Sequence, residues 1–461
     1  PFSKHPLSHQ GVVSSGTRSV PFSPSKGQRK MRRIIAENPN WSLVVVPSLS
    51  SMCLQSIVNN FEEKQIFEQL TPGQRDFIQE GLSPTLPLRV TANLIPDGVY
   101  WKRCCERRWD LCDVSRYGHS WRRMFFERHL ENLIELFIPE VTEPKAVLDV
   151  LPFCKSYVRR LNVSQLLPPI KEPQGEKDGE ENDLDLAIDS EHDEACAHHF
   201  DFGLVLRELT HLEELALVYR VKECGMNFEW KMFEMTKRDC ESLAKALNVT
   251  FLQLFRLHQS NVEDKKCRLL VKHLLDHPSL RELDLSHNLI GNGGARAIGK
   301  LLARSKLEVL NVCDNKIGEL GAKAIARALS RNSTLSSLNL RLNLVRDEGG
   351  AAIGEALRSN TTLHHLNLGG NDMTWRAASA LSDVLIENKT LRSINLSCNN
   401  LGKVGGKALA EAMSHNTTLT ELNVLLTEVD EQNASFVSEV VCANQRSEHK
   451  KQRKTGSIKY P

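Results

Sequence analysis

Two short segments contain residue types that could bind a metal or a phosphate. Cys196, His198 and His199 offer metal ligands within four residues, but no second ligand pair stands at zinc-like spacing from them. The run from Gly291 to Gly294 could cradle a phosphate, yet no Lys-Ser or Lys-Thr pair follows it, which favours an ordinary turn. No Ser/His/Asp or paired-carboxylate arrangement stands out. The sequence therefore predicts no enzyme, no cofactor and no metal site.

Four Asn-x-Ser/Thr sequons begin at Asn332, Asn360, Asn388 and Asn416. Such sequons accept glycans in secreted proteins. No signal peptide is visible at the start, although the chain begins with Pro rather than Met and we expect its true beginning to lie upstream. Because the sequons recur at one regular interval, we interpret them as structural positions at helix ends, where Asn or Gly is favoured.

An internal repeat decides the fold prediction. The frame Leu-x-x-Leu-x-Leu-x-x-Asn recurs every 27 or 28 residues, and the asparagines that close it are Asn288, Asn315, Asn343, Asn371 and Asn399. Apolar residues at helical spacing follow each frame. One strand and one helix cannot bury their apolar faces alone, but stacked copies share a continuous core. We therefore predict an α/β solenoid, curved with parallel strands inside and helices outside, in which the repeating Asn satisfies turn backbone groups.

Composition and pattern divide the chain into regions. We expect a mainly helical domain over 41–157, a solenoid of about nine strands over 158–431, and a capping helix over 432–445. Residues 171–194 form an acidic insertion that we expect to be disordered. Flexible basic tails are expected at the two ends, over 1–40 and 446–461.

The strand positions that point out of the core form the candidate binding surface. A concave face lined with polar residues suits recognition of a protein segment. One column is Asp284, Asn311, Asn339, Asn367, Asn395 and Asn423, and the neighbouring columns carry Arg281, Glu282, Arg341, His364, His365, Arg392 and Glu421. The alternative for the Asn column is a hydrogen-bonded ladder that only orders the sheet.

Charge and cysteine content restrict the class of partner. The formal net charge is +2, so bulk charge points to neither nucleic acid nor membrane, and no apolar run is long enough to span a bilayer. The 12 cysteines follow no spacing pattern, which favours a reduced, cytosolic protein over a disulfide framework. Other proteins are the expected partners.

The repeat unit resembles the ribonuclease-inhibitor class of leucine-rich repeats. The segments Trp41–Pro47, Tyr100–Trp109 and Trp121–Phe126, with the acidic insertion, resemble leucine-rich-repeat subunits of the nexin–dynein regulatory complex. That resemblance implies a non-catalytic adaptor in the axoneme of motile cilia and sperm flagella. The complex links doublet microtubules and regulates dynein-driven sliding. Its other subunits are the implied partners, and tubulin of the doublets is a further candidate.

Two other functions stay open on the sequence alone. The Trp- and Arg-rich segment Tyr100–Glu131, ahead of repeats, is similar in order to an F-box-like module and suggests a substrate adaptor of a ubiquitin ligase. Leucine-rich-repeat proteins of this class also activate small GTPases. Those end in an acidic tail, however, whereas this chain is basic over Lys450–Lys454.

Overall fold

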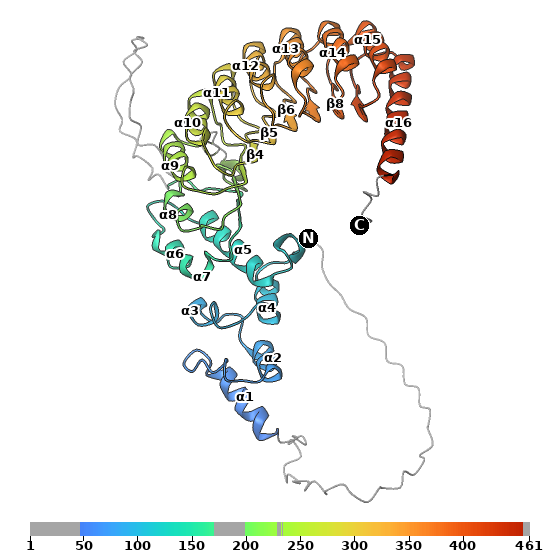
Figure 1. Cartoon of the computed structure of the whole chain (residues 1–461). Coiled ribbons are helices and arrows are strands. Elements are labelled where there is room, and N and C mark those ends of the chain that lie inside the picture. The colour runs from blue at the N-terminus through green and yellow to red at the C-terminus, as the bar shows by residue number, and fades with distance from the viewer. Residues whose placement is uncertain (1–46, 170–198, 228–231, 233, 455–461) are drawn as a thin grey trace, which may run out of the picture. The chain divides into compact units, whose positions relative to one another are not determined.

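The computed structural model describes residues 47–169, 199–227, 232 and 234–454 (Figure 1). The predicted tail 1–40 and the acidic insertion 171–194 lie outside these residues. The chain divides into two compact units, 1–56 and 57–461. Helix α1 (Leu49–Asn59) spans that division and buries none of its side chains. The larger unit contains every strand of the described chain.

The part of the larger unit that precedes the first strand is mainly helical, as predicted. Trp101 and Phe126 are buried at its centre with ring centroids 5.2 Å apart, and the Trp101 indole Nε1 donates to the Ile95 carbonyl at 3.1 Å. A buried indole is stable there because its one donor is satisfied. The elements are α2 (Pro72–Gly81), α3 (Leu88–Thr91), α4 (Val99–Arg108), η1 (Val114–Tyr117), α5 (Trp121–Glu135), α6 (Lys145–Leu148) and α7 (Leu151–Cys154).

Nine parallel strands follow in chain order as one sheet, which confirms the predicted solenoid. They are β1 (Arg160–Val163), β2 (Glu214–Leu217), β3 (Leu254–Leu257), β4 (Glu282–Asp284), β5 (Val309–Asn311), β6 (Ser337–Asn339), β7 (His365–Asn367), β8 (Ser393–Asn395) and β9 (Glu421–Asn423). Their register keeps the repeat frame, so that Leu338 lies beside Leu310 and Leu366.

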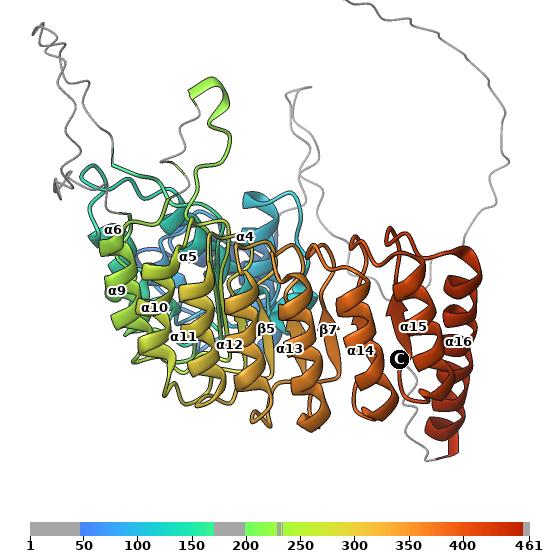
Figure 2. The same cartoon turned by 90° about the horizontal axis from the view of Figure 1, so that it is seen from above.

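Helices cover the outer side of this sheet. Figure 1 shows strands on the inside of an arc and helices on the outside, and Figure 2 shows the outer helices side by side in one row. They are α8 (Gly203–Leu206), α9 (Lys237–Leu247), α10 (Asp264–Leu274), α11 (Asn292–Leu302), α12 (Glu319–Leu329), α13 (Arg346–Ser359), α14 (Trp375–Glu387), α15 (Gly402–His415) and α16 (Glu431–Lys454), with the short η2 (Gly225–Asn227) after β2.

The leucines of each frame and the small residues of each helix form the core. Leu335, Leu338 and Leu340 are at most 1% exposed. The outer helices approach closely at small residues, because a Cβ added at Gly321 would lie 2.8 Å from the Ala295 Cβ. Stacked repeats therefore share one apolar layer between sheet and helices.

The four sequon asparagines connect the end of a helix to the next strand. Asn360 has an extended backbone rather than the left-handed one that an Asn helix end suggests. Its Nδ2 donates to the Leu329 carbonyl at 2.9 Å, and its Oδ1 accepts from the backbone N–H of Leu363 at 2.8 Å. Asn360, Asn388 and Asn416 are buried. The nitrogen that a glycan would need is thus used inside the folded repeat.

The last helix is longer than the sequence suggested. Helix α16 runs from Glu431 to Lys454, whereas the predicted cap ended at 445. Lys, Arg, Glu and Gln dominate 446–454, and these are good helix formers. The first Gly after the predicted end is Gly456, so nothing in the sequence interrupts the helix earlier. Val437 and Val441 are buried, and Asn444 Nδ2 donates to the Leu419 carbonyl at 2.9 Å, which closes the last repeat.

Candidate protein-binding surface

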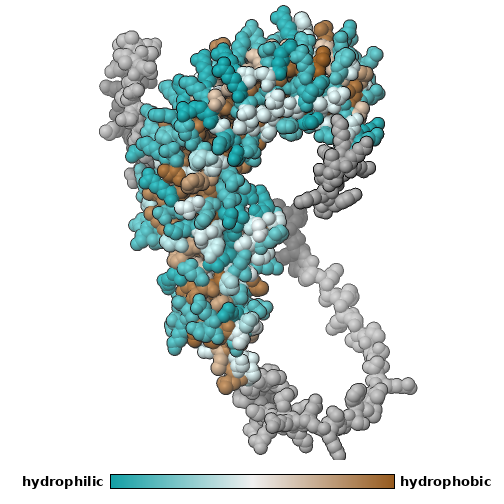
Figure 3. Space-filling view, viewed as in Figure 1, coloured by the Kyte–Doolittle hydropathy of each residue, from teal (hydrophilic) through white to brown (hydrophobic). Residues whose placement is uncertain are grey.

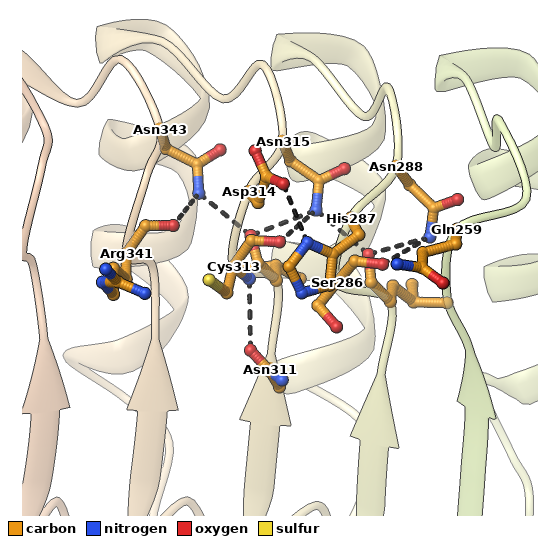
Figure 4. Close-up of polar contacts among 12 residues, drawn as sticks. Gln259, Ser286, His287, Asn288, Asn311, Cys313, Asp314, Asn315, Arg341 and Asn343 are labelled. Atoms are coloured by element: carbon orange, nitrogen blue, oxygen red, sulfur yellow. Dashed lines mark hydrogen bonds and ion pairs between the residues drawn. The ribbon is translucent and has the colours of Figure 1, made fainter. Parts of the chain in front are cut away.

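A buried asparagine after each of the strands β4 to β8 joins two successive repeats, and Figure 4 shows three of these asparagines. Asn343 Nδ2 donates to the carbonyl of Leu340 at 3.0 Å and to that of Val312, in the preceding repeat, at 2.9 Å. Asn343 Oδ1 accepts from the backbone N–H of Ile317 at 3.0 Å. The amide thus satisfies turn groups that no strand reaches. Asn288, Asn315, Asn371 and Asn399 likewise donate to a carbonyl of the preceding repeat and accept from a backbone N–H of the turn before the next helix.

The polar column at the last residue of strands β4 to β9 uses its side-chain oxygens locally. Asn339 Oδ1 accepts from the N–H of Arg341, two residues on, at 3.1 Å, and Asn367 and Asn395 make the equivalent bonds. These are Asx turns. Within the described residues the column does not form the alternative ladder of amides bonded to one another, and the Nδ2 groups of these three asparagines have no acceptor. Asp284, Asn311 and Asn423 cap their own turns in the same way.

Some of the charged residues predicted to bind a partner form ion pairs with residues of a neighbouring repeat. Arg281 bridges Glu308 at 3.0 Å, and Asp284 accepts from Arg256 at 3.1 Å. Such exposed pairs between neighbouring strands contribute little to stability, but they occupy both charges.

Further along the sheet, two of the nominated charges contact other repeats. Glu421 accepts from the Ser393 hydroxyl at 2.7 Å, and Arg392 donates from Nη1 to the Thr418 carbonyl at 3.1 Å. Glu282, Arg341, His364 and His365 are exposed, and their side chains have no hydrogen bond or ion pair with the described residues. These four side chains are the nominated charges that remain open to a partner.

A row of glutamates on helix α5 covers the free edge of the sheet. Glu127 Oε1 accepts from the backbone N–H of Arg160, the first residue of β1, at 3.1 Å and from that of Arg159 at 2.8 Å. Glu131 Oε1 accepts from the N–H of Asn162 at 2.8 Å, and Glu135 Oε1 from the N–H of Ser164 at 2.7 Å. Four helical residues rise about 6 Å and two strand residues about 6.6 Å, so carboxylates at every fourth position meet alternate strand amides.

Burial changes the acidity of two of these glutamates. The Glu127 side chain is 0% exposed and is bridged by Arg123 Nε at 2.7 Å, yet loss of hydration raises its pKa above the usual range. Burial raises the pKa of Glu131 to about 8, and the nearby Glu127 and Glu135 carboxylates add to the rise. Sequence reasoning missed this cap. The sequence pattern that could have revealed it is three glutamates spaced four residues apart, ahead of the first predicted strand.

The glycine-rich turn at Gly291–Gly294 already holds a carboxylate. Asp264 Oδ1 accepts from the backbone N–H groups of Gly291 and Gly294 at 2.7 and 2.8 Å, and its Oδ2 from that of Gly293 at 3.0 Å. Asp264 begins α10, so the preceding repeat supplies the anion that the N-terminus of α11 attracts. The favoured interpretation of this segment as a structural turn agrees with these contacts, because the amides that a phosphate would need are occupied.

The candidate metal ligands do not form a site among the described residues. Cys196 and His198 lie outside them, and His199 is buried with its Nδ1 2.8 Å from Asp239 Oδ2. No group of three or more His, Cys, Asp or Glu residues in the described ranges could hold a metal ion. A search of the same ranges for a helix long and apolar enough to cross a membrane also found none.

Comparison with known proteins first gives the class. A family model described as "Leucine Rich repeat" matches residues 276–299, 305–326, 331–354, 359–382 and 387–410. Together with the parallel sheet and its outer helices, these matches define the chain as a leucine-rich-repeat solenoid.

Curated relatives then point to one subunit of a known complex. The chain is 50% identical over 280 residues to "Dynein regulatory complex subunit 5" of Macaca fascicularis, covering 60% of this chain and 56% of the relative. It is 48% identical over 296 residues to the Homo sapiens protein of that name, covering 64% and 59%. The Chlamydomonas reinhardtii protein of that name is 31% identical over 227 residues, covering 49% and 50%.

These relatives confirm the resemblance to subunits of the dynein regulatory complex that the sequence suggested. The chain spans about half to three-fifths of the length of the curated relatives it matches.

Proposed function

We propose that this chain is a non-catalytic adaptor subunit of the nexin–dynein regulatory complex in the axoneme of motile cilia and sperm flagella. Contacts with the other subunits would hold the complex together, link doublet microtubules and regulate dynein-driven sliding. The observation that carries the proposal is the similarity to proteins named as one subunit of this complex in primates and in Chlamydomonas reinhardtii.

The concave side of the sheet supports an adaptor role. It presents polar residues from nine strands in one rigid register, and rigid placement lowers the entropy cost of binding another protein. Arg341, His364 and His365 are exposed there and not used within the described fold. We propose the concave residues predicted from the sequence as subunit contacts, with tubulin of the doublets as a further candidate partner.

Localisation followed by extraction tests this function. The tagged chain is expressed in a ciliated or spermatogenic cell, and demembranated axonemes are washed with rising salt. We expect retention along the axoneme until high salt, followed by release together with other subunits of the complex. A diffuse cytosolic or nuclear pool, or release with the detergent-soluble fraction and no such subunit, would overturn the proposal. Binding of that pool to ubiquitin-ligase core subunits would favour the ligase adaptor instead.

A further inference from the structure

The concave face changes character along the sheet. In the first five strands several of its charges are paired between neighbouring repeats, as in Arg159–Glu213 at 2.7 Å, Arg160–Glu214 at 2.8 Å and His287–Asp314 at 2.8 Å, in addition to the pairs made by Arg281 and Asp284. The four arginines in these pairs each face a carboxylate, whereas Glu282 of β4 is unpaired. This half of the face therefore offers a partner an unpaired carboxylate and no unpaired arginine from these pairs.

The next three strands present hydrogen-bond donors and no carboxylate. The three frames 335–343, 363–371 and 391–399 contain no Asp or Glu. Their inward-facing exposed or half-buried residues, which we name the donor face, are Ser336, Ser337, Asn339, Arg341, His364, His365, Asn367, Arg392, Ser393 and Asn395. The donor face is bounded by acidic residues, with Glu308 and Asp314 on the β5 side and Glu421 on β9.

The Asx turns use one acceptor site of each asparagine of the donor face and leave both N–H donors of its Nδ2 group unused. The Nδ2 groups of Asn339, Asn367 and Asn395 therefore remain for a partner. These groups repeat at the strand spacing of about 4.8 Å. Arg341 adds an exposed guanidinium beside them. A row of donors flanked by a cation matches acceptor groups that carry negative charge.

Small side chains let a partner's backbone approach the donor face. Serine and glycine occupy much of β6 to β8 and the turns that follow them. Figure 3 shows near-neutral residues gathered along the inner side of the arc, within a largely hydrophilic surface. The residues that define the donor face are thus all polar, and none of them is the kind of apolar anchor that commonly dominates tight interfaces.

We infer that the donor face binds an acidic polypeptide segment, whose Asp or Glu carboxylates accept from Arg341 and from the asparagine Nδ2 groups. Carboxylates fit better than nucleic-acid phosphates, because neutral amides supply most of the donors and few cations face inward here. The binding of an acidic segment follows from the donor face alone. Only the assignment of that segment to another subunit of the axonemal complex rests on the proposed function.

Binding of a fluorescent glutamate-rich peptide to the chain, followed by anisotropy at low salt, tests the inference. Asn367→Asp turns a donor into an acceptor with little change of shape, and Asp284 occupies the equivalent position in β4 with the same local bond. We expect Asn367→Asp and Arg341→Glu each to weaken binding at least tenfold. The matched control is Arg327→Glu, an equal change of charge at an exposed position of the outer helix α12, and it should leave binding within about twofold.

Three results would overturn the inference: no binding of the peptide at low salt, equal weakening by the Arg327 control, and preference for a single-stranded oligonucleotide over the peptide. A tenfold gain on deleting residues 171–194 would support binding of an acidic segment, but it would overturn the assignment of that segment to another subunit, because this chain's own acidic residues would compete for the face. If the peptide does not bind but the tagged chain is retained on the axoneme, only the binding role of the donor face is refuted. If the peptide binds but the tagged chain is diffuse in the cell, only the proposed function is refuted.

Discussion

Two asparagines of one repeat should differ sharply in what they contribute to stability. Asn343 is 4% exposed, and its removal by Asn343→Ala leaves the Ile317 N–H without an acceptor and deprives the Val312 and Leu340 carbonyls of a donor. An orphaned buried donor costs about 1–3 kcal/mol, and each lost carbonyl bond about 1 kcal/mol. Asn343→Ala should therefore lower the free energy of unfolding by about 3–5 kcal/mol.

Asn339→Ala is the matched control, because it removes the same side chain four residues earlier. Asn339 makes one exposed bond, to the Arg341 N–H, and water can replace it. The expected cost is about 0.5 kcal/mol. Urea unfolding followed by circular dichroism would measure both, with the dependence on urea concentration compared among variants. If the two variants differed by less than about 1 kcal/mol, the buried asparagine would not hold the repeats together as we argue.

Three further predictions follow from the same contacts. Glu131→Gln should raise stability at pH 8–9 and leave it unchanged near pH 5. Burial raises the pKa of Glu131 to about 8, so the folded wild type holds a proton that the unfolded chain has lost, and its stability falls as pH rises from about 4.5 to 8, by up to about 1.4 kcal/mol per pH unit. Parallel pH profiles of the two proteins in urea unfolding would contradict this. Asp264→Ala should cost about 2–4 kcal/mol, because three backbone N–H groups lose their acceptor, and faster hydrogen exchange at the start of α11 would reveal it; unchanged exchange there would argue against the cap. Leu338→Ala should cost about 2–5 kcal/mol by leaving a cavity, whereas Arg341→Ala should change thermal stability little, and equal melting temperatures would exclude the strand register described above.

The solenoid could be predicted because its signal is repeated and local. Each frame places leucines at alternating positions and Asn at the turn, and the same pattern in successive units leaves one way to stack them. The candidate concave residues followed from the same alternation. The sequence could not predict which of these side chains are left without a partner in the fold, because ion pairs such as Arg281–Glu308 depend on how far side chains reach between repeats.

Three features lay beyond the repeat pattern, each for a different reason. The glutamate cap requires helix α5 to lie along β1, and no repeat period places it there. The asparagines of the strand column have two possible uses, a ladder or an Asx turn, and only the backbone geometry decides between them. The length of α16 was missed because the apolar residues stop near 445, although the helix propensity continues.

The asparagine contacts also make whole repeats interchangeable. Asn343 reaches back to Val312, and Asn371 reaches back to Leu340, each over 31 residues. If the 28 residues 316–343 were removed, Asn371 would meet the Val312 carbonyl, which occupies the equivalent place, and the neighbouring layers could join again. Deletion of fewer than 28 residues would shift the register, so that the leucines of one repeat would lie beside the turn of the next. The solenoid can therefore lengthen or shorten only by whole repeats. Each repeat gained or lost moves the α16 end of the arc by one strand and one helix.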